Sequence, residues 1–434
     1  MVENLGQISP KEGKFPTNVT EWKNYFSSPE NDLKVYEDIN SLRKDVEDPN
    51  GWIKTKELAK QEIKNIPEDI IPKIFTGFEP YLENLPGGHS KNHAYRDLIN
   101  SVLISQDPWV RNLDDVEKFI GIMGGTFHDI GNSVSGRYEE TKNFSGHAER
   151  GAYLFGELTK DLLPPNLLKL TKFAIAAHTN YQRDTPIPPK MINGEEKVVV
   201  KKPYNQTLDE QNNKAGVWLT QWADRLDAQG VQFFVRNAVA SAEPKEDYSS
   251  SVGFSLKKEN EEEDFKHHFN PVLRTENFTG GMDILEHMTL FKDSALNKTI
   301  YSQHDTSYFT NELVRPNAIE QEKFIQKVLE EKPVLTDKQI SRNFETFYIM
   351  CKRVDAGSNI ETVIELLKRK FPYLSKEQRS HWANGFVVLP ELYNQMLLRT
   401  EKKLYEANNN QNQSGIFKEA GKLALNKLED LKRS

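Results

Sequence analysis

Residues 114–131 constrain the fold of this chain more than any other stretch. Their apolar side chains recur at spacings of four, three and four, the pattern of a buried helix: Val116, Ile120, Met123 and Phe127. Asp114 is suited to cap the start of this helix, and Gly131 is suited to end it. The pattern therefore predicts a core helix that carries His128 and Asp129 in its last turn.

The His128-Asp129 pair offers an imidazole and a carboxylate at one place in the chain. Burying a carboxylate without a partner costs free energy, so a cation is the natural partner for Asp129 in the core. The alternative is a surface His-Asp pair at a fraying helix end, and the dipeptide alone favours that alternative.

Two further histidines follow the Gly87-Gly88 break. His89 and His93 are four residues apart in a segment with the pattern of an amphipathic helix, so they would share one face with Arg96. Two histidines at this spacing can hold one metal ion. Two solvated histidines on a helix surface are an equally good interpretation of this segment.

Three more polar side chains lie in apolar helical patterns later in the chain. His147 lies near the start of a helix for which Ser145 is a candidate cap, and His178 lies near the end of the next helix. Either histidine, taken separately, is typical of a core histidine bonded to a carbonyl group. Asp224 lies in an apolar helix and needs a partner, which is either a nearby basic side chain or a metal ion.

Charge balance and cysteine content exclude several classes of protein. The 434 residues include 57 Lys and Arg against 64 Asp and Glu, a net charge of −7, which argues against a general nucleic-acid or membrane-surface binder. The single cysteine, Cys351, excludes an intramolecular disulfide, and its apolar helical surroundings predict core packing. No signal-peptide pattern opens the sequence and no apolar run is long enough to span a bilayer, so a cytoplasmic location is expected.

The first half of the chain is expected to hold an arm and one large domain. Residues 1–60 predict an N-terminal packing arm, with a helix that Asp32 could cap, and residues 61–243 predict a helical metal-binding domain. Residues 186–213 interrupt the helices with a β-hairpin turning at Asn193-Gly194. This hairpin is either a lid over a site or a surface decoration.

The second half is expected to be helical after a break. Residues 244–282 are rich in serine, glycine and acidic side chains and predict a flexible insertion or linker. Residues 283–434 show successive amphipathic patterns and predict a helical accessory region, with a homodimer interface as one use for it. The fold class predicted for the whole chain is all-α, with one small inserted hairpin.

Three segments together resemble the HD superfamily, which is named for its His…His-Asp…Asp metal ligands on a bundle of helices. His93 and Arg96 resemble that family's first-ligand motif, commonly His-x-x-Arg, and the run from His128 to Gly131 resembles its hallmark. Asp224 stands in a segment similar to its last-ligand helix. The resemblance covers about residues 85–240 and implies an HD-type helical bundle.

Members of that superfamily with two further histidines between the His-Asp pair and the last Asp hold two metal ions, and His147 and His178 stand at those places. The resemblance thus implies two divalent cations, with Asp129 bridging them, His93, His128 and Asp224 on one, and His147 and His178 on the other. Nitrogen and oxygen donors without a thiolate suit Mn, Fe, Co, Ni, Zn or Mg, and spacing does not choose among them. Asp129 and His89 are the candidate catalytic residues, with His89 as an extra ligand or a proton donor.

Such a site implies a metal-dependent phosphohydrolase that cleaves a small phosphate ester, such as a nucleotide or cyclic nucleotide, with metal-activated water. The loop cations Arg137, Lys142 and Arg183 are candidates for holding substrate phosphate. Asn132 stands where members that cleave cyclic dinucleotides usually have Lys, which argues against that substrate. Two other functions remain open: a di-iron oxygenase with the same ligand order, and a non-catalytic ligand-binding protein.

Overall fold

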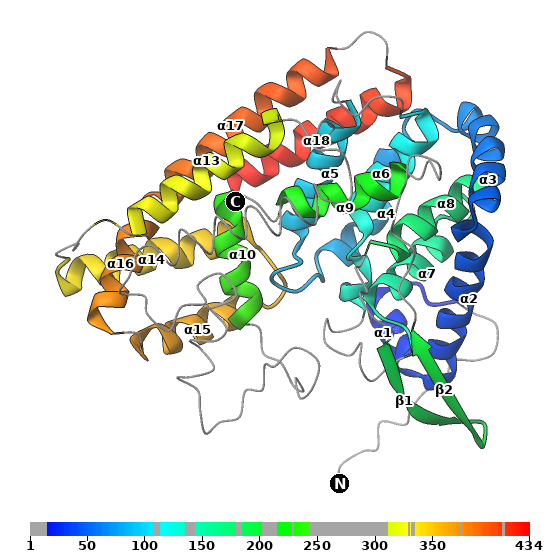
Figure 1. Ribbon diagram of the computed structural model, residues 1–434, viewed down its shortest axis with the longest axis horizontal. Helices are drawn as coiled ribbons and strands as arrows, with labels where there is room; N and C mark the ends of the chain where they lie inside the picture. Colours follow the sequence, from blue (N-terminus) through cyan, green and yellow to red (C-terminus); the bar gives the residue numbers. More distant parts are fainter. Residues whose placement is uncertain are drawn as a thin grey trace.

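The computed structural model describes residues 15–106, 113–134, 144–178, 185–201, 215–227, 230–242, 311–328, 330, 335–373, 375–409 and 413–434. Within these ranges the fold is all-α apart from one β-hairpin, as the sequence predicts (Figure 1). The elements are α1 (Val19–Ser27), α2 (Pro29–Glu47), α3 (Pro49–Glu62), η1 (Ile63–Asn65), α4 (Ile70–Leu82), α5 (Lys91–Gln106), α6 (Asp115–Phe127), η2 (Ile130–Ser133), α7 (His147–Thr159), α8 (Pro165–Ala176), β1 (Thr185–Ile192), β2 (Glu195–Lys201), α9 (Ala215–Asp227), α10 (Val231–Ala242), α13 (Asn311–Val328), α14 (Asp337–Val354), α15 (Ile360–Lys370), η6 (Phe371–Tyr373), α16 (Lys376–Phe386), α17 (Leu389–Asn408) and α18 (Gly415–Arg433). None of the described helices combines the length and apolar composition that crossing a membrane requires.

Three helices form the centre of the fold. α5, α6 and α9 pack against one another in the middle of the molecule, and α8 packs against both α6 and α9 (Figure 1). α7 packs against α8 and η2, while α2 and α3 pack against α8 from the outside. The helices that carry the predicted ligands are therefore covered by others, which keeps their facing sides away from water.

The central helix α6 begins where the sequence predicts. Oδ1 of Asp114 accepts a hydrogen bond from the backbone N–H of Glu117 (3.0 Å), and Oε2 of Glu117 accepts one from the backbone N–H of Asp114 (3.2 Å). The predicted apolar stripe along α6 is fully buried. The helix ends at Phe127 with His128 as its C-cap, so Asp129 lies just beyond the helix and not in its last turn as predicted.

Gly131 was expected to end α6, and this expectation is wrong. Gly131 lies within η2 and does not adopt a positive φ angle. A Cβ atom at this position would lie 1.9 Å from the carbonyl oxygen of His147 and 2.8 Å from the backbone nitrogen of Gly151. Glycine is therefore required because η2 lies directly against the first turn of α7, and this contact brings Asp129 beside His147.

The predicted hairpin is present, and its turn has the expected backbone. β1 and β2 pair antiparallel, and the turn residues Asn193 and Gly194 have φ angles of 52° and 82°, as a type I′ turn requires. β1 begins at Thr185, so the prolines at 186–189 lie within the strand rather than before it. Residues 202–214 of the expected insertion lie outside the described residues.

The helices after residue 311 share a core with those before residue 242. One cluster of buried apolar side chains extends from Trp22 in α1 to Leu431 in α18, and Cys351 is fully buried within it, as predicted. α18 packs against α4 and α5, and α10 packs against α14 and α15 (Figure 1). The expected linker at 244–282 lies outside the described residues.

Candidate metal centre

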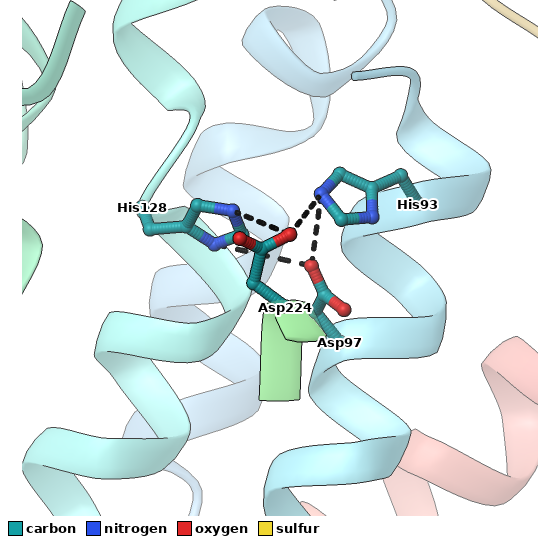
Figure 2. A group of neighbouring side chains, drawn as sticks. All are labelled: His93, Asp97, His128 and Asp224. Atoms are coloured by element: carbon teal, nitrogen blue, oxygen red, sulfur yellow. Dashed lines mark ion pairs between the residues drawn. The ribbon is translucent and has the colours of Figure 1, made fainter. Parts of the chain in front are cut away.

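The six residues predicted as metal ligands meet at one place, although they come from five separate segments: His93 from α5, His128 and Asp129 from the end of α6, His147 from the start of α7, His178 from just after α8, and Asp224 from α9. Figure 2 shows His93, His128 and Asp224 turned toward one another across the space between α5, α6 and α9. The convergence depends on the packing of these helices, because none of the five segments adjoins another in sequence.

One oxygen of Asp129 faces the first pair of imidazoles. Its Oδ2 atom lies 3.3 Å from Nε2 of His93 and 3.2 Å from Nε2 of His128. Oδ1 of Asp224 lies 3.6 and 3.8 Å from the same two nitrogens. Donor atoms at these separations can share one cation, because metal–ligand bonds of about 2.0–2.2 Å span such a group.

The other oxygen of Asp129 faces the second pair. Its Oδ1 atom lies 3.5 Å from Nε2 of His147 and 3.7 Å from Nε2 of His178. The two Nε2 atoms are 3.2 Å apart. The Asp129 carboxylate thus stands between two groups of donors, with one oxygen directed to each group.

Hydrogen bonds to backbone carbonyl groups orient two of the imidazole rings. Nδ1 of His128 lies 2.8 Å from the carbonyl oxygen of Gly125, and Nδ1 of His178 lies 2.6 Å from that of Ile175. A carbonyl accepts only from a protonated Nδ1, so Nε2 is the nitrogen that faces Asp129 and that can bind a metal once its proton is lost. The buried Nε2 atoms of His93 and His128 make no hydrogen bond within the described part of the chain, so a metal ion fits the atoms that are present.

Nearby carboxylates control the charge of the buried imidazoles. Burial opposes protonation of His93, yet the surrounding carboxylates, Asp97 first among them, raise its pKa to about 9. Burial opposes protonation of His128 as well, and Asp129 raises its pKa to about 10. Burial would raise the pKa of Asp129, but the facing imidazoles hold it well below its usual range. The site therefore has the strongly negative field that a cation requires.

His89 was expected on the same helix as His93, and this expectation is wrong. α5 begins at Lys91, so His89 lies in the turn that precedes the helix. Its ring still reaches the site, because Nδ1 of His89 contacts Oδ2 of Asp129. The turn itself, rather than helical spacing, places His89 beside the metal ligands.

The loop between α14 and α15 holds this turn in place. The backbone N–H of Gly88 donates to a carboxylate oxygen of Asp355, and that of Gly87 donates to Oδ1 of Asn359 (2.6 Å). A Cβ atom at Gly357 would lie 2.2 Å from the backbone nitrogen of Gly87. The C-terminal helices were expected to contribute no catalytic residue, but they form the support for the segment that carries His89.

Sequence reasoning missed Asp97 and Asp227, two buried carboxylates at the site. Oδ2 of Asp97 lies 3.0 Å from Nε2 of His93, and Oδ2 of Asp227 lies 2.8 Å from Nδ1 of the same ring. Arg96 donates to both oxygens of Asp227, and Arg236 donates to one of them. A signal was present, because Asp97 follows His93 by one helical turn.

Asp32 was expected to cap a helix, but it holds the start of α7 instead. α2 begins at Pro29, and the buried Asp32 carboxylate accepts hydrogen bonds from the backbone N–H groups of Phe144 (2.6 Å) and Ser145 (3.2 Å). Nη2 of Arg150 donates to the same carboxylate at 3.0 Å. Ser145 is not the N-cap of α7, because the helix begins at His147 and Gly146 is its N-cap.

Three predicted substrate-binding residues lie outside the described residues: Arg137, Lys142 and Arg183. Among the six predicted ligands, Asp224 at the end of α9 has the most exposed side chain. The side chain of Asp224 is 37% exposed, against 1% for His93 and 2% for His128. Asp224 is therefore in contact with solvent, whereas His93 and His128 are enclosed.

Comparison with known families identifies this arrangement. The family model for the HD domain matches residues 93–229, which begins at the first predicted ligand and includes all six. The chain therefore carries an HD domain, the metal-binding helical domain of a superfamily of metal-dependent phosphohydrolases. No curated protein and no solved structure matches the chain.

Proposed function

We propose that this chain is a divalent-metal-dependent phosphohydrolase whose substrate is a small phosphate ester, such as a nucleotide or cyclic nucleotide. The observation that carries the proposal is the orientation of Asp129, whose Oδ2 faces His93 and His128 and whose Oδ1 faces His147 and His178. A carboxylate in this orientation is suited to bridge two cations, and paired cations are typical of phosphatases and nucleases.

The six residues divide naturally between two cations: His93, His128 and Asp224 for one, His147 and His178 for the other, and Asp129 for both. The donors are imidazole nitrogens and carboxylate oxygens without a thiolate, which suits Mn, Fe, Co, Ni, Zn or Mg. The carbonyl contacts of His128 and His178 support this assignment, because they leave each Nε2 atom available as a ligand.

When bound, a pair of cations supplies a water nucleophile at neutral pH and neutralises charge on the phosphate oxygens. The chain's own residues prepare the site. Burial of His93, His128 and Asp129 excludes bulk water from the inner side of the site, and the hydrogen bonds to their ring nitrogens prevent rotation of the imidazoles. Low solvent access strengthens every charge interaction with the substrate.

His89 is our candidate for the group that holds a proton near the leaving oxygen. It contacts the Asp129 carboxylate, and its side chain is 17% exposed against 7% for Asp129, so it is more accessible to a substrate than Asp129 is. A histidine between a carboxylate and the substrate can donate a proton without leaving a buried, uncompensated charge. Arg137, Lys142 and Arg183 remain our candidates for holding the remaining phosphate oxygens.

The proposal is tested by metal analysis followed by a phosphate-release screen. The purified chain is expected to contain divalent metal, and to release phosphate from a nucleotide or sugar phosphate when Mn²⁺ is added. Asp129→Asn should abolish both the second equivalent of metal and the activity, because it removes the charge shared by the two groups of donors. Asp69→Asn is the matched control, since Asp69 is exposed and its side chain makes no capping hydrogen bond at the start of α4.

Two outcomes would contradict the proposal. Tightly held iron with turnover that depends on dioxygen would favour an HD-type oxygenase. Unchanged metal content and unchanged hydrolysis in Asp129→Asn would show that the catalytic assignment is wrong.

A further inference from the structure

Asp97 is a buried carboxylate that points into the donor group from the α5 side. It follows His93 by one helical turn, and its side chain is fully buried. Oδ2 of Asp97 lies 3.0 Å from Nε2 of His93 and 3.9 Å from Nδ1 of His128. Figure 2 shows this carboxylate directed at the space between His93, His128 and Asp224.

The Asp97 carboxylate has only imidazole rings, those of His93 and His128, as ionic partners in the described part of the chain. Neither of its oxygens makes a hydrogen bond, and no lysine or arginine in the described part of the chain pairs with it. Asp227, equally buried and 2.8 Å from the other nitrogen of the same His93 ring, is paired with both Arg96 and Arg236. Asp227 is thus neutralised by two guanidinium groups, whereas Asp97 has none, and a cation bound beside it would offset the cost of its burial.

The nitrogen that Asp97 faces is already surrounded by carboxylates. Nε2 of His93 has oxygens of Asp97, Asp129 and Asp224 at 3.0, 3.3 and 3.6 Å. One donor atom from each of His93, Asp97, His128 and Asp224 lies within 4.8 Å of the others. Three carboxylates around one point carry more negative charge than His93 and His128 offset even when both are protonated, and a divalent cation can offset it.

We propose that Asp97 is an additional oxygen ligand of the cation held by His93, His128 and Asp224, and that it selects a hard cation such as Mn²⁺ over Zn²⁺. This inference rests on the metal binding proposed above. With Asp97 and Asp129 included, the group offers three carboxylates and two imidazoles. Carboxylate-rich groups suit Mg²⁺ and Mn²⁺, whereas imidazole-rich groups suit Zn²⁺.

The experiment compares Asp97→Asn with Asp227→Asn in the full-length chain. Each variant replaces a carboxylate by an amide, Asp97 beside Nε2 of His93 and Asp227 beside Nδ1 of the same ring. Only Asp97 faces the donor group. Affinities for Mn²⁺ and for Zn²⁺ are measured by competition with a chelating dye after removal of bound metal. The visible absorption of the Co²⁺-loaded chain reports the number of ligands.

Asp97→Asn is expected to weaken Mn²⁺ binding at least about tenfold more than Zn²⁺ binding, and to intensify the Co²⁺ absorption as the ligand number falls. Asp227→Asn is expected to weaken both cations by a similar factor, of about 10- to 100-fold, because it only orients His93. Its Co²⁺ spectrum should match that of the unmodified chain.

Parallel losses of Mn²⁺ and Zn²⁺ in Asp97→Asn, with an unchanged Co²⁺ spectrum, would overturn the inference and leave Asp97 as a hydrogen-bond acceptor of His93. An unmodified chain that binds neither cation would overturn the proposed function itself. Thermal unfolding confirms that each variant is folded. If Asp97→Asn does not fold, Asp97→Ala provides the same comparison without adding a polar group.

Discussion

Nη1 of Arg96 donates a hydrogen bond to the carbonyl oxygen of Val354, 2.6 Å away. The same guanidinium donates to Asp227, which in turn contacts Nδ1 of His93. Val354 is the last residue of α14, so one side chain joins α5, which carries the candidate ligand His93, to the C-terminal region. The C-terminal helices are therefore part of the support for the candidate metal centre.

Gly357→Ala tests this support. Its added Cβ atom would lie 2.2 Å from the backbone nitrogen of Gly87, so the turn that carries His89 must move. We expect turnover to fall on the order of a hundredfold with metal content retained, because displacement of a catalytic group by about 1 Å has this effect. Gly77→Ala is the matched control, since a Cβ there meets nothing within 4 Å. Equal activity in the two variants would show that the loop does not position His89.

Gly131→Ala tests the contact between η2 and α7. The new methyl group would lie 1.9 Å from the carbonyl oxygen of His147, so the two segments must separate. We expect a loss of about 1–3 kcal/mol in the free energy of unfolding in urea, which is the usual cost of overpacking. Metal titration should also show weaker binding of the second equivalent, the one assigned to His147 and His178. An unchanged free energy of unfolding and unchanged binding of the second equivalent would contradict this prediction and show that η2 and α7 can separate at little cost.

Asp32→Ala removes the carboxylate that holds the start of α7. It removes the carboxylate that pairs with the buried Arg150 and that accepts from the backbone N–H groups of Phe144 and Ser145. Breaking a buried pair from one side costs about 3–5 kcal/mol, and urea unfolding should show a loss of that size. Asp69→Ala, on the surface, should change the unfolding free energy little. A small effect at Asp32 would indicate that solvent replaces the lost partners.

Metal binding should release protons at neutral pH. The metal-free chain holds His93 and His128 with pKa values of about 9 and about 10, both raised above the usual 6.5, so both rings are protonated at pH 7. A metal displaces these protons, so its affinity should increase as the pH rises toward 9. Calorimetry in buffers of different ionisation enthalpy measures the number released. Binding without proton release would mean that the rings are neutral in the metal-free chain.

The stability of the metal-free chain should have the opposite pH dependence. Because the folded-state pKa of His93 lies above its unfolded value, the charged ring stabilises the fold fully below about pH 6.5. This contribution is lost as the pH rises through about 9. Thermal unfolding in the presence of a chelator, measured from pH 6 to 10, should therefore show a falling midpoint, and an increase over this range would contradict the assigned shift.

Much of the local structure follows from short-range pattern. The apolar spacing of α6, its capping box at Asp114 and the type I′ turn at Asn193-Gly194 each depend on residues close in sequence, and each appears where predicted. The order of histidines and aspartates along the chain was enough to predict the HD domain, because that order belongs to the ligands themselves.

Other features depend on contacts between residues far apart in the chain. Asp227 pairs with Arg96, and Asn359 accepts a hydrogen bond from Gly87; both contacts link segments more than 100 residues apart. The position of His89 in its turn depends on the second of these contacts. The sequence also predicted the position of Asp97 on its helix, but it could not predict that no lysine or arginine of the described chain would pair with it. The sequence alone determined which helices form and which side chains they offer. Only tertiary packing decided which of those side chains share a site, because that depends on how buried charges are paired across helices.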